Sequence, residues 1–214
     1  MGAAKKQQLL CAARTVFLKH GYALSSVDEI AKTADVSKAT LYAHFEDKLE
    51  LFRAVIVEST KRYAERIFKE SEIGDIALEP ALYSIARNFV DVISDPDARS
   101  LYRISLAESP RHPDIGRAFL ESGPDVARRR LERFLNRRTA LGELEIDDVP
   151  LAAQQFVEMC KAGIFHRTMF ELDHGGGDEE RERIARAAVR TFVRAFAAPI
   201  IAEKSSSQNI SRRS

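Results

Sequence analysis

The segment DVSKATLYAHFEDK, residues 35–48, carries many hydrogen-bonding side chains and few apolar ones. The hydrogen-bonding side chains are those of Ser37, Lys38, Thr40, Tyr42, His44 and Lys48. A plain core helix would leave most of these polar groups idle on a solvated face. A helix that lies against a polyanion would use them on phosphates and base edges. The segment therefore indicates a surface helix that contacts a polyanionic partner.

Local signals divide the region around this segment into four helices. Gly21 suits the left-handed residue that ends a first helix, and Ser26 begins an S-x-x-E capping box that starts a second. Ser37 is placed to cap a third helix, and Asp47 to cap a long fourth one. The second and third helices are joined by the tight turn 34–36. This is the plan of a helix-turn-helix, whose second helix enters the major groove of DNA.

The run SSVDEIAKTADVSKATLYAHFEDKLELF, residues 25–52, resembles the DNA-binding domain of the TetR family of one-component transcriptional repressors. The resemblance extends over residues 5–53 and depends on an ordered combination: Val36-Ser37, then Tyr42 and Phe45 three residues apart, then Lys48. The family usually has glycine in the turn where this chain has Asp35. Asp tolerates left-handed backbone better than most residues, so we expect the turn to persist.

The helix-turn-helix plan and the resemblance together predict the DNA contacts. The candidates are Ser25, Ser26, Ser37, Lys38, Ala39, Thr40, Tyr42, His44 and Lys48. The two serines begin the second helix, where outward backbone N–H groups offer a phosphate site, and the resemblance implies that Lys48 contacts phosphate. Other roles remain open: Tyr42 as a packed ring, His44 as a charge at a helix end, and Lys38 and Lys48 as ordinary surface lysines.

Helical spacing of apolar residues continues along most of the chain, and no stretch keeps the alternation of a strand, so we expect an all-α fold. Beyond the long fourth helix, the expected helices cover residues 81–94, 98–108, 113–121, 123–140, 149–172 and 179–202. We divide the chain into a helix-turn-helix domain (1–50), a ligand-binding and dimerisation domain (51–203) and a disordered polar tail (204–214).

The second domain is dense in large apolar residues, which permit a pocket between helices for a mainly hydrophobic small-molecule effector. The pocket candidates are Phe89, Val92, Ile93, Tyr102, Ile104, Phe119, Phe134, Phe165 and Met169. For any single one of them, an ordinary core position is the better interpretation. The segment LYRISLAESPRHPDIGRAFLESGP, residues 101–124, resembles the effector domain of an AefR-like branch of the family. That resemblance implies control of efflux or stress genes.

Apolar stripes near the end of the chain predict a four-helix interface between two subunits. The interface candidates are Phe156, Cys160, Gly163, Ile164, Ala188, Phe192, Ala195 and Phe196. A twofold homodimer would read a palindromic operator in double-stranded DNA, with half-sites about 34–36 Å apart.

Composition excludes some other classes of protein. The chain has 214 residues, a net charge of +1 and two cysteines without CxxC spacing, so neither a disulfide framework nor a uniformly basic surface is expected. It carries no targeting segment and no apolar run long enough for a membrane, and we expect a cytoplasmic protein. The arginine-rich run 128–138 is typical of a solvated face of an amphipathic helix.

Two alternatives to a ligand-responsive regulator remain. An effector-independent DNA-binding protein would use the same helix-turn-helix, but it would not need so large a helical body. A metal-binding helical-bundle enzyme would use an E-x-x-H pair such as Glu171 and His174, yet the sequence offers a single copy and no nucleotide-binding or hydrolase motif. We therefore expect no metal site, no cofactor and no enzymatic activity.

Overall fold

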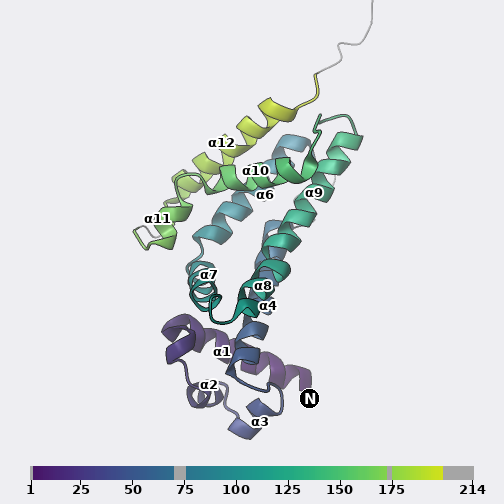
Figure 1. Ribbon diagram of the computed structural model, residues 1–214. Helices are drawn as coiled ribbons and strands as arrows, with labels where there is room; N and C mark the ends of the chain where they lie inside the picture. The colour runs from purple at the N-terminus through teal and green to yellow at the C-terminus, as the bar shows by residue number, and fades with distance from the viewer. Residues whose placement is uncertain (1, 70–75, 173–174, 200–214) are drawn as a thin grey trace, which may run out of the picture.

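The computed structural model describes residues 2–69, 76–172 and 175–199, and most of this part of the chain is helical (Figure 1). The helices are α1 (Gly2–Leu24), α2 (Val27–Thr33), α3 (Lys38–Tyr42), α4 (Lys48–Ile67), α6 (Leu78–Ser94), α7 (Pro96–Glu108), α8 (Pro113–Ser122), α9 (Pro124–Ala140), α10 (Val149–Lys161), α11 (Phe165–Met169) and α12 (Asp178–Phe196). The all-α prediction is confirmed. None of the helices within these ranges is long and apolar enough to cross a membrane.

The predicted capping residues define the helices at the N-terminal end. The Ser26 hydroxyl accepts a hydrogen bond from the Glu29 amide at 3.1 Å, which starts α2. Ser37 does the same for Thr40 at 3.1 Å, and the Asp47 carboxylate accepts from the Glu50 amide at 2.7 Å. These side chains replace partners that the first turn of a helix lacks. All three predicted caps are confirmed.

The molecule has two apolar cores, one at each end of α4. The N-terminal core is formed by α1–α3 and the first half of α4, with Leu101 and Ile115 added from the body of the protein. The body core lies among α6, α9, α10 and α12 and takes in the end of α4 through Ile67. In Figure 1, α4 rises from the small N-terminal unit into the helical body. The domain division expected at residue 50 therefore falls within a continuous helix.

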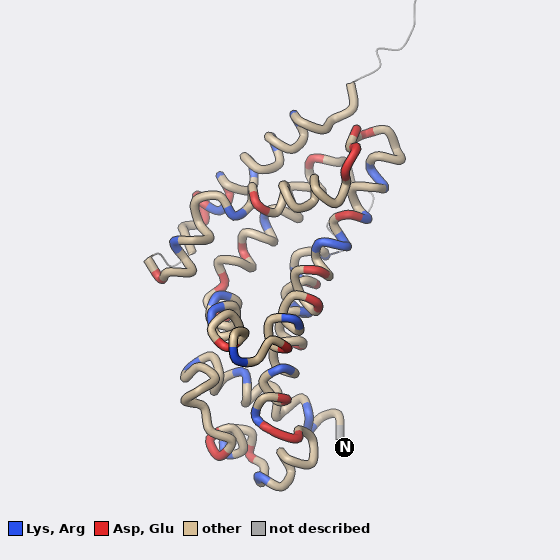
Figure 2. The backbone as a smooth tube through the Cα atoms, viewed as in Figure 1, with Lys and Arg blue, Asp and Glu red and all other residues tan. Residues whose placement is uncertain are grey.

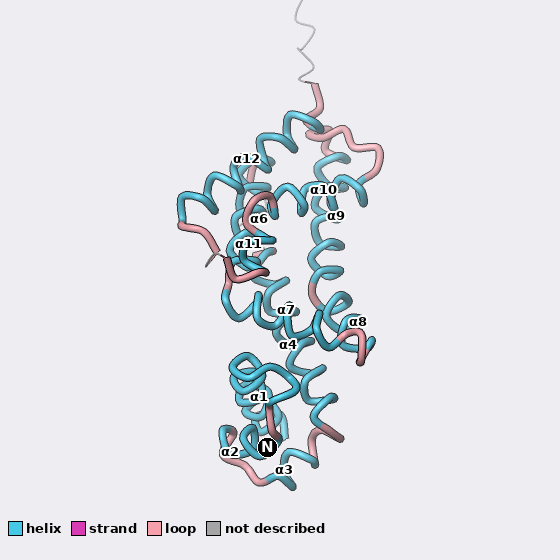
Figure 3. The backbone as a smooth tube through the Cα atoms, turned by 60° about the vertical axis from the view of Figure 1, so that its left-hand side comes forward, coloured by secondary structure: helices cyan, strands magenta, loops and turns pink. Residues whose placement is uncertain are grey.

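The expected single helix over residues 149–172 is wrong. The structure has α10 ending at Lys161 and a separate short α11 beginning at Phe165. Between them Gly163 has a φ of 79°, in the left-handed region that ends helices. The two helices appear as separate segments in Figure 3, with a bend between them.

The last helix is shorter than the expected range of 179–202. It ends at Phe196, and the chain becomes extended at Ala197. The backbone there pairs with the loop that follows α9: the Glu145 amide donates to the Phe196 carbonyl at 2.8 Å, and the Ala198 amide donates to the Glu143 carbonyl at 3.1 Å. This pairing removes carbonyl and amide groups that further helix would need. The expected tail, 204–214, lies outside the described residues.

Candidate DNA-reading helix and effector cavity

Two buried residues anchor α3 to the rest of the N-terminal unit, which consists of α1–α3 and the first half of α4. Leu41 is fully buried and Phe45 almost so, and both pack into the N-terminal core. The turn before α3 has Asp35 in left-handed backbone with φ 48°, as expected from its tolerance of that conformation. The Gln8 side chain on α1 donates to the Ala34 carbonyl at 2.6 Å, which ties the turn to α1.

The outer side of α3 presents several of the predicted DNA-contact residues to solvent. Ser37, Lys38 and Ala39 are exposed, and Tyr42 has 51% of its surface exposed. Lys38 forms an ion pair with Asp28 of α2, but both side chains are more than half exposed, so the pair costs little to exchange for a phosphate. The Thr40 hydroxyl lies 2.9 Å from that of Ser37.

Two predicted contact residues have other partners in the structure. The side chain of Ser25 is buried, and its hydroxyl donates to the Gly21 carbonyl at 2.5 Å, so that hydroxyl cannot reach a phosphate. The Lys48 ammonium donates to the carbonyls of Tyr22 and Ser25, each at 3.0 Å, and lies 4.5 Å from the centre of the Tyr22 ring. In the chain without DNA, the charge of Lys48 thus holds the α1–α2 connection, and its expected contact with phosphate stays a prediction.

The other two candidates lie at the edges of the reading surface. Ser26 is exposed, but its hydroxyl is already engaged as the cap of α2. His44 follows the end of α3 rather than lying on it, and it is half-buried with its ring 6.5 Å from that of Phe45. Both can contact DNA only at the margin of a groove that α3 enters.

Charges of both signs are interspersed over the body of the protein, as Figure 2 shows along α9. Arg128 pairs with Glu132 at 2.5 Å. Arg138 is buried and pairs with Glu143 at 2.9 Å. Two arginines of the run are thus paired within the chain, while Arg129, Arg133 and Arg137 are exposed on the solvated face that the sequence predicts.

A cavity of about 610 Å³ lies in the body of the protein. Its walls come from α4, α6, α7, α8, α9, α10 and α11, and this volume is within the usual range for small-molecule sites. Seven of the pocket candidates line it: Phe89, Val92, Ile93, Tyr102, Phe119, Phe165 and Met169. Tyr102 forms edge-to-face ring pairs with Phe119 at 5.5 Å and with Phe165 at 5.7 Å. The site is thus an apolar space with a strongly aromatic wall.

Two pocket candidates lie elsewhere, and the prediction for them is wrong. Ile104 packs against the N-terminal core, because its side of α7 faces the N-terminal unit. Phe134 packs against the body core with the Arg138 guanidinium 5.1 Å from its ring centre. Helical spacing identifies an apolar face but not the neighbour that it meets.

Several polar side chains reach the cavity that the sequence did not indicate. Thr60 and Tyr63 of α4 contribute to its wall, as does the buried Arg99 of α7. Burial raises the pKa of Tyr63 above its ordinary value, so its hydroxyl keeps its proton at neutral pH and can both donate and accept.

Most of the residues predicted for a subunit interface are buried within one chain. Exposed fractions are 3% or less for Phe156, Cys160, Ile164, Ala188 and Phe192. These five side chains belong to the body core, and two of them, Phe156 and Cys160, also line the cavity. Gly163 and Ala195 are exposed and Phe196 is half-buried. The apolar stripes of α10 and α12 therefore face their own chain, and an interface must use other faces.

The E-x-x-H pair cannot be placed, because His174 lies outside the described residues. Glu171 is at the surface and pairs with Arg103 at 2.5 Å. Among the residues that are described, no three His, Cys, Asp or Glu side chains gather in a way that could hold a metal ion.

Comparison with known protein families matches both ends of the chain. Residues 9–55 match the model described as bacterial regulatory proteins, tetR family. Residues 80–198 match the C-terminal domain of AefR-like transcriptional repressors. The first match contains the helix-turn-helix and the second contains most of the cavity wall.

Individual relatives agree with these matches. The transcriptional repressor AcnR of Corynebacterium diphtheriae is 27% identical over 84% of this chain and 87% of its own. A TetR-family regulator structure from Mesorhizobium loti superposes with a TM-score of 0.87 at 29% identity, covering 92% of this chain and 99% of that one. The structure of the flavonoid-responsive regulator FrrA has a TM-score of 0.75 at 33% identity, covering 91% of this chain and 98% of its own.

Proposed function

Because this chain belongs to the TetR family of bacterial transcriptional regulators, we propose that it represses transcription as a homodimer and leaves its operator when a small aromatic effector binds. The family is one of DNA-binding regulators and not of enzymes. The operator would be a palindrome in double-stranded DNA, since a twofold dimer presents its two α3 helices to equivalent half-sites. Such a protein would act in the cytoplasm, where its operator is.

One observation supports this function above the others. A single helix, α4, begins beside the DNA-reading α3 and ends as part of the cavity wall. A ligand that binds one position of α4 better than another must shift the position of α3, because the two sites share a rigid element. An effector-independent DNA-binding protein would have no use for a cavity along this helix.

The cavity favours a flat, mainly apolar ligand that carries hydroxyl groups. Its aromatic wall offers edge and face contacts to a ring system, while the hydroxyl of Tyr102 provides a point for a hydrogen bond. The regulator FrrA, with 33% identity, is named as flavonoid-responsive. We therefore propose a polyphenol of similar size as the effector, and genes for the export of such compounds or for stress as the targets.

Selection of genomic DNA with the purified protein tests the DNA-binding half of this proposal. The enriched fragments should share a palindrome with half-sites one helical turn apart, about 34–36 Å. Fluorescence anisotropy should then show that operator affinity falls as salt rises, in proportion to the phosphates contacted. Failure to enrich any duplex in dilute buffer would refute the regulator.

A panel of polyphenols, fatty acids and apolar cations tests the effector half. A polyphenol such as naringenin should raise the melting temperature and weaken operator binding by about 5- to 150-fold, the usual range of allosteric coupling. Replacing Phe119 with aspartate should abolish the thermal shift by placing a charge in the aromatic wall. A response to fatty acids alone would contradict the polyphenol assignment while leaving the regulator intact.

A further inference from the structure

The N-terminal unit (α1–α3 and the first half of α4), here called the DNA-reading unit, meets the body of the protein where α1 lies against α4 and α7. Tyr63 of α4 stands at this junction. It packs against both the N-terminal core and the body core, and its side chain also forms part of the cavity wall. A change in the position of this ring would therefore alter the packing of both cores.

One charged side chain crosses the junction from α1 and contacts both neighbouring helices. The Arg14 guanidinium donates to the Tyr63 hydroxyl at 3.3 Å and to the Asp97 carboxylate at 2.7 Å. Asp97 lies in the first turn of α7, directly before the cavity residues Ala98 and Arg99. The same nitrogen of Arg14 thus connects the DNA-reading unit to two helices that enclose the cavity.

Further contacts support this arrangement. The Arg66 guanidinium lies 5.7 Å from the centre of the Tyr63 ring and pairs with Asp95 at 3.1 Å. Asp95 also caps α7, accepting from the amides of Asp97 and Ala98. The ring of Tyr63 thus lies beside a charged group that is itself paired with the cap of α7.

We propose that Arg14, bound between the Tyr63 hydroxyl and the Asp97 carboxylate, is a latch that fixes the DNA-reading unit against the body, and that an effector opens it by displacing the Tyr63 ring. The inference rests on the proposed function, because it takes the cavity as the effector site. It adds the path by which occupancy of that site reaches α3.

The geometry explains why a small movement would suffice. At 3.3 Å the bond from Arg14 to Tyr63 is near the upper limit of hydrogen-bond length, so a displacement of about 1 Å breaks it. Arg14 then keeps only its pair with Asp97, whose side chain is 51% exposed and whose attraction water screens. The DNA-reading unit loses its fixed orientation, and two half-sites can no longer be met at once.

A first experiment tests the latch without ligand or DNA. Spin labels on Thr33→Cys and Asn136→Cys, both at exposed positions, in a Cys11→Ser background report the distance between the DNA-reading unit and the body, with unlabelled subunits in excess. Tyr63→Phe, which removes the hydroxyl but keeps the ring, should broaden the distance distribution.

The matched control is Tyr102→Phe, which removes a hydroxyl from the same cavity but has no contact with Arg14. Whatever it does to ligand affinity, it should leave the distance distribution as in the wild type. A second control, Lys61→Met, removes an exposed charge of α4. Unchanged distances in Tyr63→Phe, or equal broadening in Tyr102→Phe, would overturn the latch.

A second experiment measures coupling. On an operator fragment recovered by the genomic selection, Tyr63→Phe and Arg14→Met should each weaken ligand-free binding about threefold or more, and the double variant no more than either single one, as expected for two partners in one contact. The ratio of operator affinities without and with saturating naringenin should fall towards one in Tyr63→Phe and stay as in the wild type in Lys61→Met.

The outcomes separate the two proposals. If wild-type protein does not respond to naringenin, the effector assignment fails and the spin-label distances alone decide the latch. If the wild type responds and Tyr63→Phe responds equally, the latch is refuted while the proposed function stands. Additive effects of the two single variants on operator affinity would also count against it.

Discussion

The two cysteines show how much environment decides the chemistry of one side chain. Burial raises the pKa of the Cys160 thiol to about 12, whereas Cys11 is exposed on α1. Alkylation requires the thiolate, so iodoacetamide at neutral pH should modify Cys11 in the native protein and Cys160 only after unfolding. Intact mass should show one added group in native buffer and two in guanidinium chloride. Two groups in native buffer would mean that the helix packing around Cys160 opens readily.

Lys48 has a partner within the chain besides the phosphate that its sequence position predicts. Its sequence position indicates a phosphate contact, and in the structure its ammonium group donates to backbone carbonyls at the junction of α1 and α2. A carbonyl left without a partner is costly when it is shielded from water. Sequence alone cannot distinguish these roles, because both require a lysine at the start of a helix.

Replacing Lys48 with methionine separates the two roles. We expect thermal unfolding to show a loss of about 1–3 kcal/mol, because the carbonyls of Tyr22 and Ser25 lose their donor. The slope of log affinity against log salt should stay unchanged. A slope lowered by about 1 with unchanged stability would instead identify Lys48 as a phosphate contact. Lys38→Met is the comparison, since its exposed charge should lower the slope without affecting stability.

At the level of helices, the beginnings were predicted better than the ends. Ser26, Ser37 and Asp47 were identified because a capping side chain acts on amides three residues away, within the same few residues of sequence. The end of α12 depends instead on pairing with the Glu143–Glu145 backbone, some fifty residues earlier in the chain. Such a partner leaves no local signal. The break at Gly163 did have one, which the continuous apolar stripe concealed.

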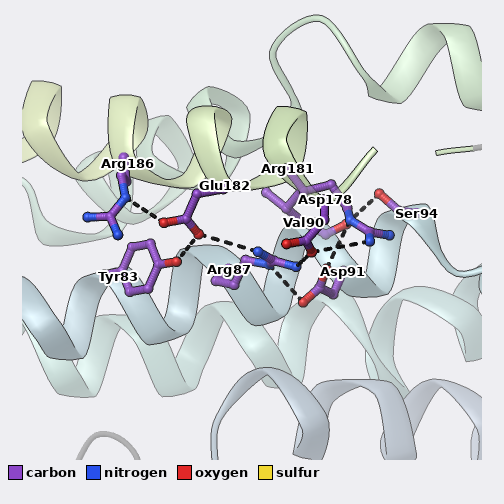
Figure 4. Close-up of polar contacts among 9 residues, drawn as sticks. All are labelled: Tyr83, Arg87, Val90, Asp91, Ser94, Asp178, Arg181, Glu182 and Arg186. Atoms are coloured by element: carbon purple, nitrogen blue, oxygen red, sulfur yellow. Dashed lines mark hydrogen bonds and ion pairs between the residues drawn. The ribbon is translucent and has the colours of Figure 1, made fainter. Parts of the chain in front are cut away.

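Helices α6 and α12 are joined by a polar network that the sequence did not indicate (Figure 4). Arg87 of α6 binds Asp178 of α12 and lies 3.3 Å from Glu182, which also binds Tyr83. Hydrogen bonding and charge from Arg87 lower the pKa of Asp178, and the Tyr83 hydroxyl and neighbouring arginines lower that of Glu182. These contacts hold α12 against α6 in the body of the protein.

This network predicts a sensitivity to acid. A carboxylate whose pKa is lowered by folding stabilises the fold above its unfolded pKa, and that stability is lost as pH falls through the folded value. The melting temperature should therefore decrease once the pH is lowered past about 4–5, where unfolded Asp and Glu begin to bind protons. Arg87→Gln should lower the melting temperature at neutral pH and flatten this acid dependence. Arg183→Gln, at a side chain 76% exposed, is the control and should change neither.

For the whole molecule, the sequence predicted the two functional parts but not the division of apolar surface between core and interface. Periodicity shows that a helix has an apolar face, and it is silent on whether that face meets the same chain or another one. In α12 the stripe of Ala188 and Phe192 meets α6 and α10 of its own chain. The subunit contact of a homodimer must then use faces of the helices that are exposed in the single chain.

The outward faces of α10 and α12 differ in chemistry. On α12 the exposed positions include Arg183, Arg190 and Arg194, a row of like charges. On α10 they include Leu151, which is 49% exposed, and Glu158. Around a twofold axis, two α12 helices facing each other would bring arginines together. Packing α12 of one subunit against α10 of the other avoids that repulsion, and we expect this arrangement.

This arrangement predicts opposite behaviour for substitutions of Phe192, which the sequence placed in the interface, and of Leu151, which it did not. Phe192→Ala should remove about 3–5 kcal/mol from the stability of each subunit, because the ring is fully buried in its own chain. Leu151→Asp should leave the melting of the isolated subunit nearly unchanged and shift the dimer to monomer in sedimentation at micromolar concentration. Leu106→Asp, which alters a leucine 61% exposed on α7, should leave the dimer intact. If Leu151→Asp stayed dimeric while Phe192→Ala became a stable monomer, the stripes of α10 and α12 would have to open outward in the dimer, and the single-chain core described above would rearrange on association.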